Sequence, residues 1–154
     1  MWLDERSEFC DAEAISPAQG STALIGDVID LGTVPRDIGQ GQPVYLVLSV
    51  DTIFDGGTSY QFILASDDQA AIRVASVAGE EIRHVLTDVI PEATWIQGFT
   101  LTLPLPMGGV EGTGTYKRFL GILLVDVGSS TSGNINAFLT IDPHGWTSYP
   151  DATN

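Results

Sequence analysis

The residue types that most often perform chemistry are sparse and scattered in this chain. Its histidines, His84 and His144, lie far apart in the sequence and in none of the spacings that place two imidazoles on one metal ion. A metal centre like that of cupin enzymes needs several imidazoles or carboxylates converging on one ion. The single cysteine, Cys10, cannot form an internal disulfide. The sequence therefore predicts no metal ligands and no cofactor site.

Motifs of hydrolases and phosphate-binding loops do not fit the sequence either. Residues 128–133 read Gly-Ser-Ser-Thr-Ser-Gly, which differs from the Gly-x-Ser-x-Gly nucleophile elbow, and no helix pattern follows them. Residues 109–114 share only their glycines with a phosphate-binding loop, and Glu111 would repel a phosphate. The 20 acidic residues can be paired in many ways, so no pair specifically indicates a glycosidase. We expect no catalytic residues.

Aromatic residues offer a different kind of site. Trp2, Trp95, Trp146 and Tyr149 could form a flat stacking platform for sugar rings, as in a carbohydrate-binding module. Aromatic side chains near the termini also suit contacts with a partner protein, because large rings often anchor interfaces. On that interpretation the candidate contacts are Trp2, Phe9, Trp146 and Tyr149. Both interpretations stay open, as does a third in which the rings only cap the core.

The elements that must position such residues are predicted to be β-strands. The 17 glycines and 8 prolines recur between short runs rich in Val, Ile, Leu, Phe and Thr, a spacing typical of an all-β sandwich or barrel. We therefore predict an antiparallel β-sandwich with jelly-roll topology. The expected strands are residues 27–31, 44–50, 60–65, 72–77, 99–105, 119–127 and 135–141.

Three of these segments indicate their place in a sheet. Residues 99–105 alternate between apolar and polar side chains, and Pro104 and Pro106 lack the N–H of a ladder donor, so this strand is expected to end there or to lie at a sheet edge. Residues 119–127 are apolar on both faces, which is typical of a central strand. Residues 135–141 are expected to return beside them as a hairpin partner.

The 154 residues are predicted to form a single domain, since a chain of this length buries enough surface for a core without disulfides. We expect an extended arm with one short strand over residues 1–41, the sandwich over 42–142 and a C-terminal tail over 143–154. A short helix is expected over residues 8–15, and residues 80–86 fit a helix or a strand equally. The first residues lack the basic and apolar segments of a signal peptide, which indicates a cytoplasmic product.

The charge balance narrows the choice of partners. With 20 acidic and 6 basic residues the formal charge is −14, which disfavours nucleic acids and anionic membrane surfaces. The longest uncharged stretch, residues 93–110, is interrupted by Gly and Pro and does not fit a membrane-spanning helix. Charged residues make up only 17%, against about 25% in ordinary soluble domains. Much uncharged surface must remain outside the core, where it meets another protein or forms a Thr/Ser/Gly-rich face with nothing bound.

A series of short motifs, taken in order, resembles one known family. These are Met1-Trp2-Leu3-Asp4 with residues 9–12, residues 28–32 with 36–39 and Gly41-x-Pro43, residues 50–52, residues 103–106, residues 116–120, and residues 137–142 with Tyr149-Pro150-Asp151. In order and spacing they resemble the jelly-roll capsid cement, or decoration, proteins of short-tailed bacteriophages.

This resemblance implies a non-enzymatic virion protein that binds the outside of a phage head and joins neighbouring major capsid subunits. Packaged DNA would repel a chain of charge −14, so the outer face suits it. We expect a homo-oligomer, with a dimer as the commonest symmetric form. A carbohydrate-binding β-sandwich is the alternative function, and an acidic glycoside hydrolase is the third. Within the motifs, Asp30, Arg36 and Asp37 are expected to form a local ion pair.

Removing metal ions is predicted to leave the protein unchanged, because the two histidines are isolated and the cysteine is single. Dialysis against a chelator should alter neither the melting temperature nor capsid binding. A stoichiometric metal found by elemental analysis would contradict this prediction.

Overall fold

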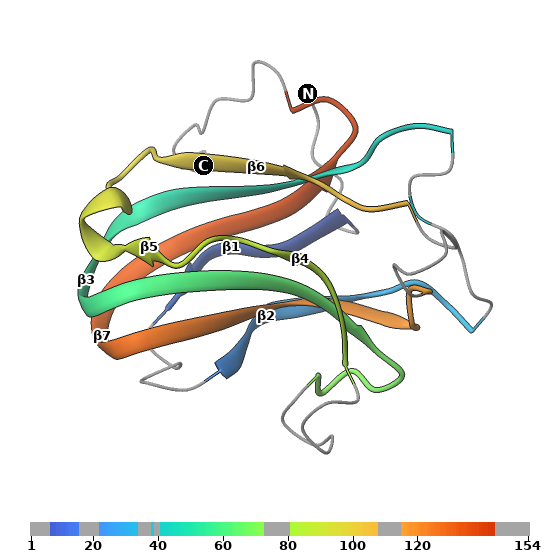
Figure 1. Ribbon diagram of the computed structural model, residues 1–154, viewed down its shortest axis with the longest axis horizontal. Coiled ribbons are helices and arrows are strands. Elements are labelled where there is room, and N and C mark those ends of the chain that lie inside the picture. Colours follow the sequence, from blue (N-terminus) through green and yellow to red (C-terminus); the bar gives the residue numbers. More distant parts are fainter. Residues whose placement is uncertain are drawn as a thin grey trace, which may run out of the picture.

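Antiparallel β-strands make up nearly all of the regular structure (Figure 1). The computed structural model describes residues 7–15, 22–33, 38, 41–72, 81–107 and 115–143. Within these ranges no helix has the length and apolar character that a membrane crossing requires. The strands are β1 (Glu8–Ala14), β2 (Thr22–Asp30), β3 (Tyr45–Asp67), β4 (Ile82–Leu86), β5 (Ile90–Pro91), β6 (Thr100–Pro104) and β7 (Phe119–Thr140), with a short 3-10 helix η3 (Glu92–Thr94). The predicted all-β class is confirmed.

Two long strands, β3 and β7, organise the sheet. They pair with each other from Tyr45 opposite Thr140 to Asp67 opposite Phe119, and both bend midway. The first half of β3 and the second half of β7 form one layer in the order β1-β7-β3-β6. The other halves form a second layer in the order β2-β7-β3-β4, with β5 also on β3. This arrangement is the antiparallel sandwich of a jelly roll.

The bends differ from the turns that the sequence suggested. The expected strands 44–50 and 60–65 are separate, as are 119–127 and 135–141, but β3 and β7 each continue through the residues between them. Asp55 pairs with Ser132 and Gly57 pairs with Gly128, so the two bends stay paired to each other through a series of register shifts. Such bulges bend a strand and increase its twist without ending it.

The N-terminal region corrects two expectations. Residues 8–15 were predicted as a helix, but residues 8–14 form β1, which pairs with β7 from Glu8 opposite Phe138 to Ala14 opposite Asn134. Phe9 and Cys10 are buried in the core, and this tertiary packing overrides the weak local preference for a helix. Because β2 also pairs with β7, most of the described residues of the predicted arm belong to the sandwich.

Other strand predictions are confirmed with changed bounds. Residues 80–86, which fitted a helix or a strand, contain β4, and the expected short strand at 27–31 lies at the end of the longer β2. β6 forms a layer edge, as its prolines indicated. Ile72 lies in a turn, and the rest of the predicted strand 72–77 lies outside the described residues.

The main core fills the space between the two layers. Leu46 and Leu48 of β3 and Ile122 and Leu124 of β7 are fully buried there, and each large apolar side chain stabilises the fold by roughly 1.5–3 kcal/mol. A second apolar cluster covers the outer face of the β2-β7-β3-β4 layer. Its buried members are Ile63, Ala65, Ile72 and Leu123. Burial on both faces explains why most of residues 119–127 are apolar, although Asp126 among them is a buried carboxylate.

The edges formed by β1 and β2 approach each other closely at Gly26. Its φ is +65°, and a Cβ atom there would lie 2.3 Å from the carbonyl oxygen of Phe9 and 2.6 Å from the Cβ of Cys10. Gly32 also has a left-handed φ, +91°, but a Cβ atom there would have no neighbour within 4 Å. Comparing substitutions at the two glycines therefore separates the cost of backbone strain from the cost of steric overlap.

We predict that Gly26→Ala destabilises the protein more than Gly32→Ala. Both substitutions force alanine into a left-handed conformation, at about 1–2 kcal/mol, and only Gly26→Ala adds overpacking, at about 1–3 kcal/mol more. Urea unfolding of both variants and the wild type measures the difference. Equal losses would show that β1 and β2 do not approach as closely as described.

Candidate functional site

Of the four aromatic residues predicted as partner contacts, Phe9 is among the described residues. Phe9 is 1% exposed and packs in the core from β1, so its ring offers a partner no surface while β1 is paired. Trp2, Trp146 and Tyr149 lie outside the described residues. Among the described side chains, no three His, Cys, Asp or Glu converge in a way that could hold a metal ion.

Trp95 corrects the sugar-platform hypothesis at one position. Its ring is fully buried, stacked on Phe54 with centroids 5.2 Å apart and edge-on to Phe99 at 5.4 Å. The indole N–H donates to the carbonyl oxygen of Ile90 at 3.3 Å. Since a stacking platform needs an exposed ring face, Trp95 cannot belong to one. It belongs to the core instead.

Above this aromatic cluster, the bends of β3 and β7 and the helix η3 lie together at one end of the sandwich, at the left in Figure 1. The N–H of Phe54 donates to the carbonyl oxygen of Trp95 at 3.1 Å, which joins the bend of β3 to the segment after η3. On these joined segments, Ile53 and Ile96 are 53% and 54% exposed. This end therefore presents apolar side chains on a backbone that the cluster beneath holds in place.

A buried carboxylate holds the bend of β7. Asp126 accepts a hydrogen bond from the backbone N–H of Ser130 at 3.1 Å, and the Ser130 hydroxyl donates to the carbonyl oxygen of Ile15 at 3.4 Å. Asp126 pairs with Tyr60 across the strands. Burial, and then the charge of Asp126, raise the pKa of Tyr60 to about 12. These contacts fix the bend against β1 and β3.

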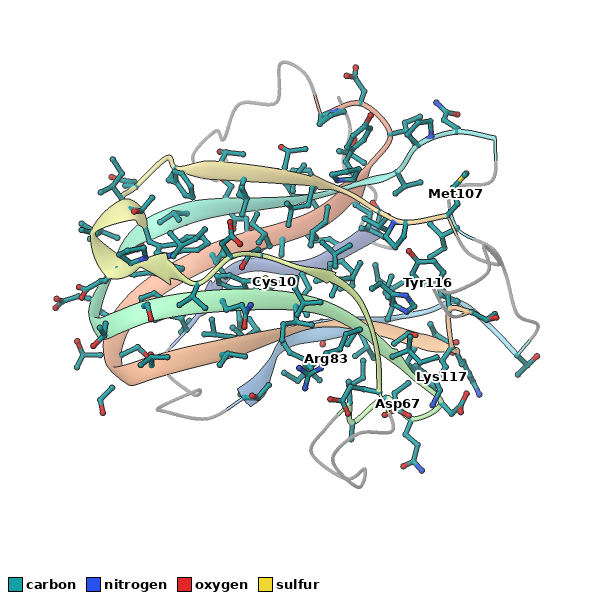
Figure 2. All side chains as sticks on the ribbon, viewed as in Figure 1. Cys10, Asp67, Arg83, Met107, Tyr116 and Lys117 are labelled. Atoms are coloured by element: carbon teal, nitrogen blue, oxygen red, sulfur yellow. The ribbon has the colours of Figure 1, made fainter. Side chains whose placement is uncertain are left out.

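A polar network joins strands near the opposite end. The Ser66 hydroxyl lies 2.7 Å from Nε2 of His84 and accepts a hydrogen bond from the backbone N–H of Lys117 at 3.0 Å. The His84 ring stacks on Tyr116 with centroids 4.0 Å apart, and the Tyr116 hydroxyl donates to the carbonyl oxygen of Pro106 at 2.8 Å. Figure 2 shows Tyr116 and Lys117 at this end, opposite the bends.

A serine and a histidine at this distance resemble a nucleophile and its base. Ser66, however, is 0% exposed, so its hydroxyl is closed to a substrate and instead links β3, β4 and the segment that enters β7. Burial lowers the pKa of His84 from 6.5 to about 4, which keeps the ring neutral near pH 7. We assign these residues a role in holding the fold. No sequence pattern links Ser66, His84 and Tyr116, because they lie far apart along the chain.

Each basic residue in the described part of the chain pairs with an acid. Arg118 donates two hydrogen bonds to Asp30, at 2.8 and 3.0 Å, which lowers the pKa of Asp30 from 3.8 to about 2. The predicted local ion pair of Asp30 with Arg36 and Asp37 stays a prediction, because Arg36 and Asp37 lie outside the described residues; the partner that the structure adds to Asp30 is the distant Arg118. The two further pairs are Arg83 with Glu81 at 3.1 Å and Lys117 with Asp68 at 3.4 Å.

Comparison with known proteins identifies one family. The family model named Bbp16 matches residues 9–139, from β1 almost to the end of β7. The match thus covers the strands of both layers. The comparison with curated proteins finds no match.

We predict that His84 makes the stability depend on pH. Because the pKa of His84 is about 4 in the folded state and near 6.5 in the unfolded state, its contribution is complete above pH 6.5 and is lost as the pH falls toward 4. The free energy of unfolding should fall across this range in the wild type and fall less in His84→Phe, which keeps an aromatic ring against Tyr116. Urea unfolding at several pH values measures both proteins, and an identical slope in the variant would contradict the prediction.

Proposed function

This chain belongs to the Bbp16 family, and we propose that it is a bacteriophage virion protein that binds the outer surface of the head and joins neighbouring major capsid subunits. The proposed role needs no catalytic step and no cofactor. Its partners are the major capsid protein and further copies of the chain itself.

The observation that carries the proposal is the jelly-roll order of the strands. The resemblance of the sequence motifs to capsid cement proteins implies the same fold. Its motifs lie on the strands that build the two layers, at residues 28–32 in and after β2, 50–52 in β3, 103–106 at the end of β6, and 137–142 at the end of β7. Motifs and fold therefore support the same family of proteins.

The distribution of charge supports an outer position on the shell. The formal charge is −14, and the three described basic side chains are each engaged by a carboxylate. The described surface therefore offers little positive charge to neutralise DNA phosphates. An acidic protein is held at the outer face at lower electrostatic cost than beside packaged DNA.

A protein that binds the assembled lattice but not the separate subunits stabilises the lattice by that binding. A ligand that binds one state stabilises that state by RT ln(1 + [L]/Kd), about 2.7 kcal/mol at a hundredfold excess over Kd. An oligomer that contacts two subunits gains further, because the second contact is intramolecular. The exposed side chains of Ile53 and Ile96, at the end formed by the bends, are suitable for one such contact.

Heads that lack this protein are predicted to rupture at a lower temperature than decorated heads. Adding the purified protein should restore the rupture temperature and give a fixed ratio to the major capsid protein by mass spectrometry. Heads that are equally robust without it, or a variable ratio, would contradict the proposed function.

Deleting residues 1–6 is predicted to weaken head binding by about tenfold or more, or about 1.4 kcal/mol, because it removes the candidate contact Trp2. The deletion ends before Phe9, whose buried ring belongs to the core, so the melting temperature should stay unchanged. Deleting residues 1–9 serves as the contrasting variant and should lower it. Full head occupancy by the shorter deletion would show that this segment is no anchor.

A further inference from the structure

The edge formed by β6 differs from the other edges in the described part of the sandwich. β1 and β2 are both interrupted by register shifts and carry acidic residues, and β4 carries Arg83 and faces a register shift in β3. Charges and bulges of this kind protect edges from pairing with other chains. β6 pairs with β3 in unbroken register from Thr100 to Pro104 and contains no charged residue. Of these four edges it is the one without a charged residue or a register shift, and its protection is limited to its short length and to Pro104 at its end.

The backbone groups that β6 offers follow from its pairing with β3. The N–H of Leu105 donates to Val44, and the carbonyl oxygen of Phe99 accepts from Val50, both at 2.9 Å. In an antiparallel pair, alternate residues direct both backbone groups to the same neighbour, so Leu101 and Leu103 also face β3. Thr100, Thr102 and Pro104 therefore direct their backbone groups away from β3, and no described strand pairs with them there.

Charge indicates which chain suits this edge. Two copies of a chain with a formal charge of −14 repel each other wherever their acidic surfaces meet. Pairing through β1 would bring Glu8, Asp11 and Glu13 of each copy together. Residues 93–110, which include β6, contain no Asp, Glu, Lys or Arg. Contact along β6 therefore lets two copies meet without placing carboxylates opposite each other.

We propose that β6 pairs antiparallel with β6 of a second copy about a two-fold axis, joining their β1-β7-β3-β6 layers into one continuous sheet. Antiparallel registers centred on Leu101 or Thr102 both let the strands exchange N–H···O=C bonds, and both use the N–H of Thr102. Pro104 lacks only a donor and still offers its carbonyl oxygen. The second copy also covers Leu101 and Leu103, which are partly exposed in the single chain. This interface does not depend on head binding.

Thr102→Pro tests the interface selectively. The substitution removes an N–H that points away from β3, so the bonds between β6 and β3 are retained. The full-length wild type should sediment at twice the 16.4 kDa of one chain. The variant should dimerise about 10- to 100-fold more weakly, since two symmetry-related hydrogen bonds are lost. Thr102→Val keeps the backbone donor and shape and is the matched control, expected to dimerise like the wild type.

A second variant and a direct probe cover the case in which Thr102→Pro fails to fold. Thr102→Lys keeps the backbone donor but brings two like charges together near the axis, so the dimer should again weaken. Hydrogen exchange of the Thr102 amide should slow at concentrations where the dimer forms. A monomeric wild type, a dimer unaffected by both variants, or fast exchange of this amide in the dimer would each overturn the proposal.

Discussion

The pairing of β3 with β7 over their full lengths is the interaction on which both layers depend. Each of the two strands contributes one half to each layer. β1 and β2 pair directly with β7, whereas β4, β5 and β6 do not. Those three pair with β3. The sandwich is thus a single sheet folded at two bends, and whatever fixes the bends also fixes how the layers face each other.

The contacts at the two ends of the sandwich serve this constraint. At the bends, Asp126 and the ring of Trp95 hold the chain against the core. Near the other end, the Ser66 hydroxyl joins β3 to His84 of β4 and to the chain entering β7. These buried polar groups gain their hydrogen bonds only when the strands are in register, so they favour one arrangement of the layers. The hydrogen bonds of these buried polar side chains therefore stabilise the fold.

The outer surface combines two properties that usually oppose each other. A formal charge of −14 keeps copies apart, whereas a charged fraction of 17% leaves long stretches with no charge at all. The uncharged edge of β6 is one place where another chain can approach without meeting a carboxylate on the strand itself. A protein that must associate at defined surfaces and otherwise stay dispersed benefits from this separation.

The sequence alone determined the all-β class, the placement of residues 99–105 at a strand end or a sheet edge, and the central position of residues 119–127. These follow from alternation, prolines and apolar faces, which are local properties. Only the tertiary structure decided that residues 128–134 bend within a strand, that residues 8–14 pair in the sheet, and which rings are buried. It also decided that Asp30 pairs with Arg118. Each of these depends on a partner distant in sequence, and the free energy of such contacts exceeds local preference, so no local pattern encodes them.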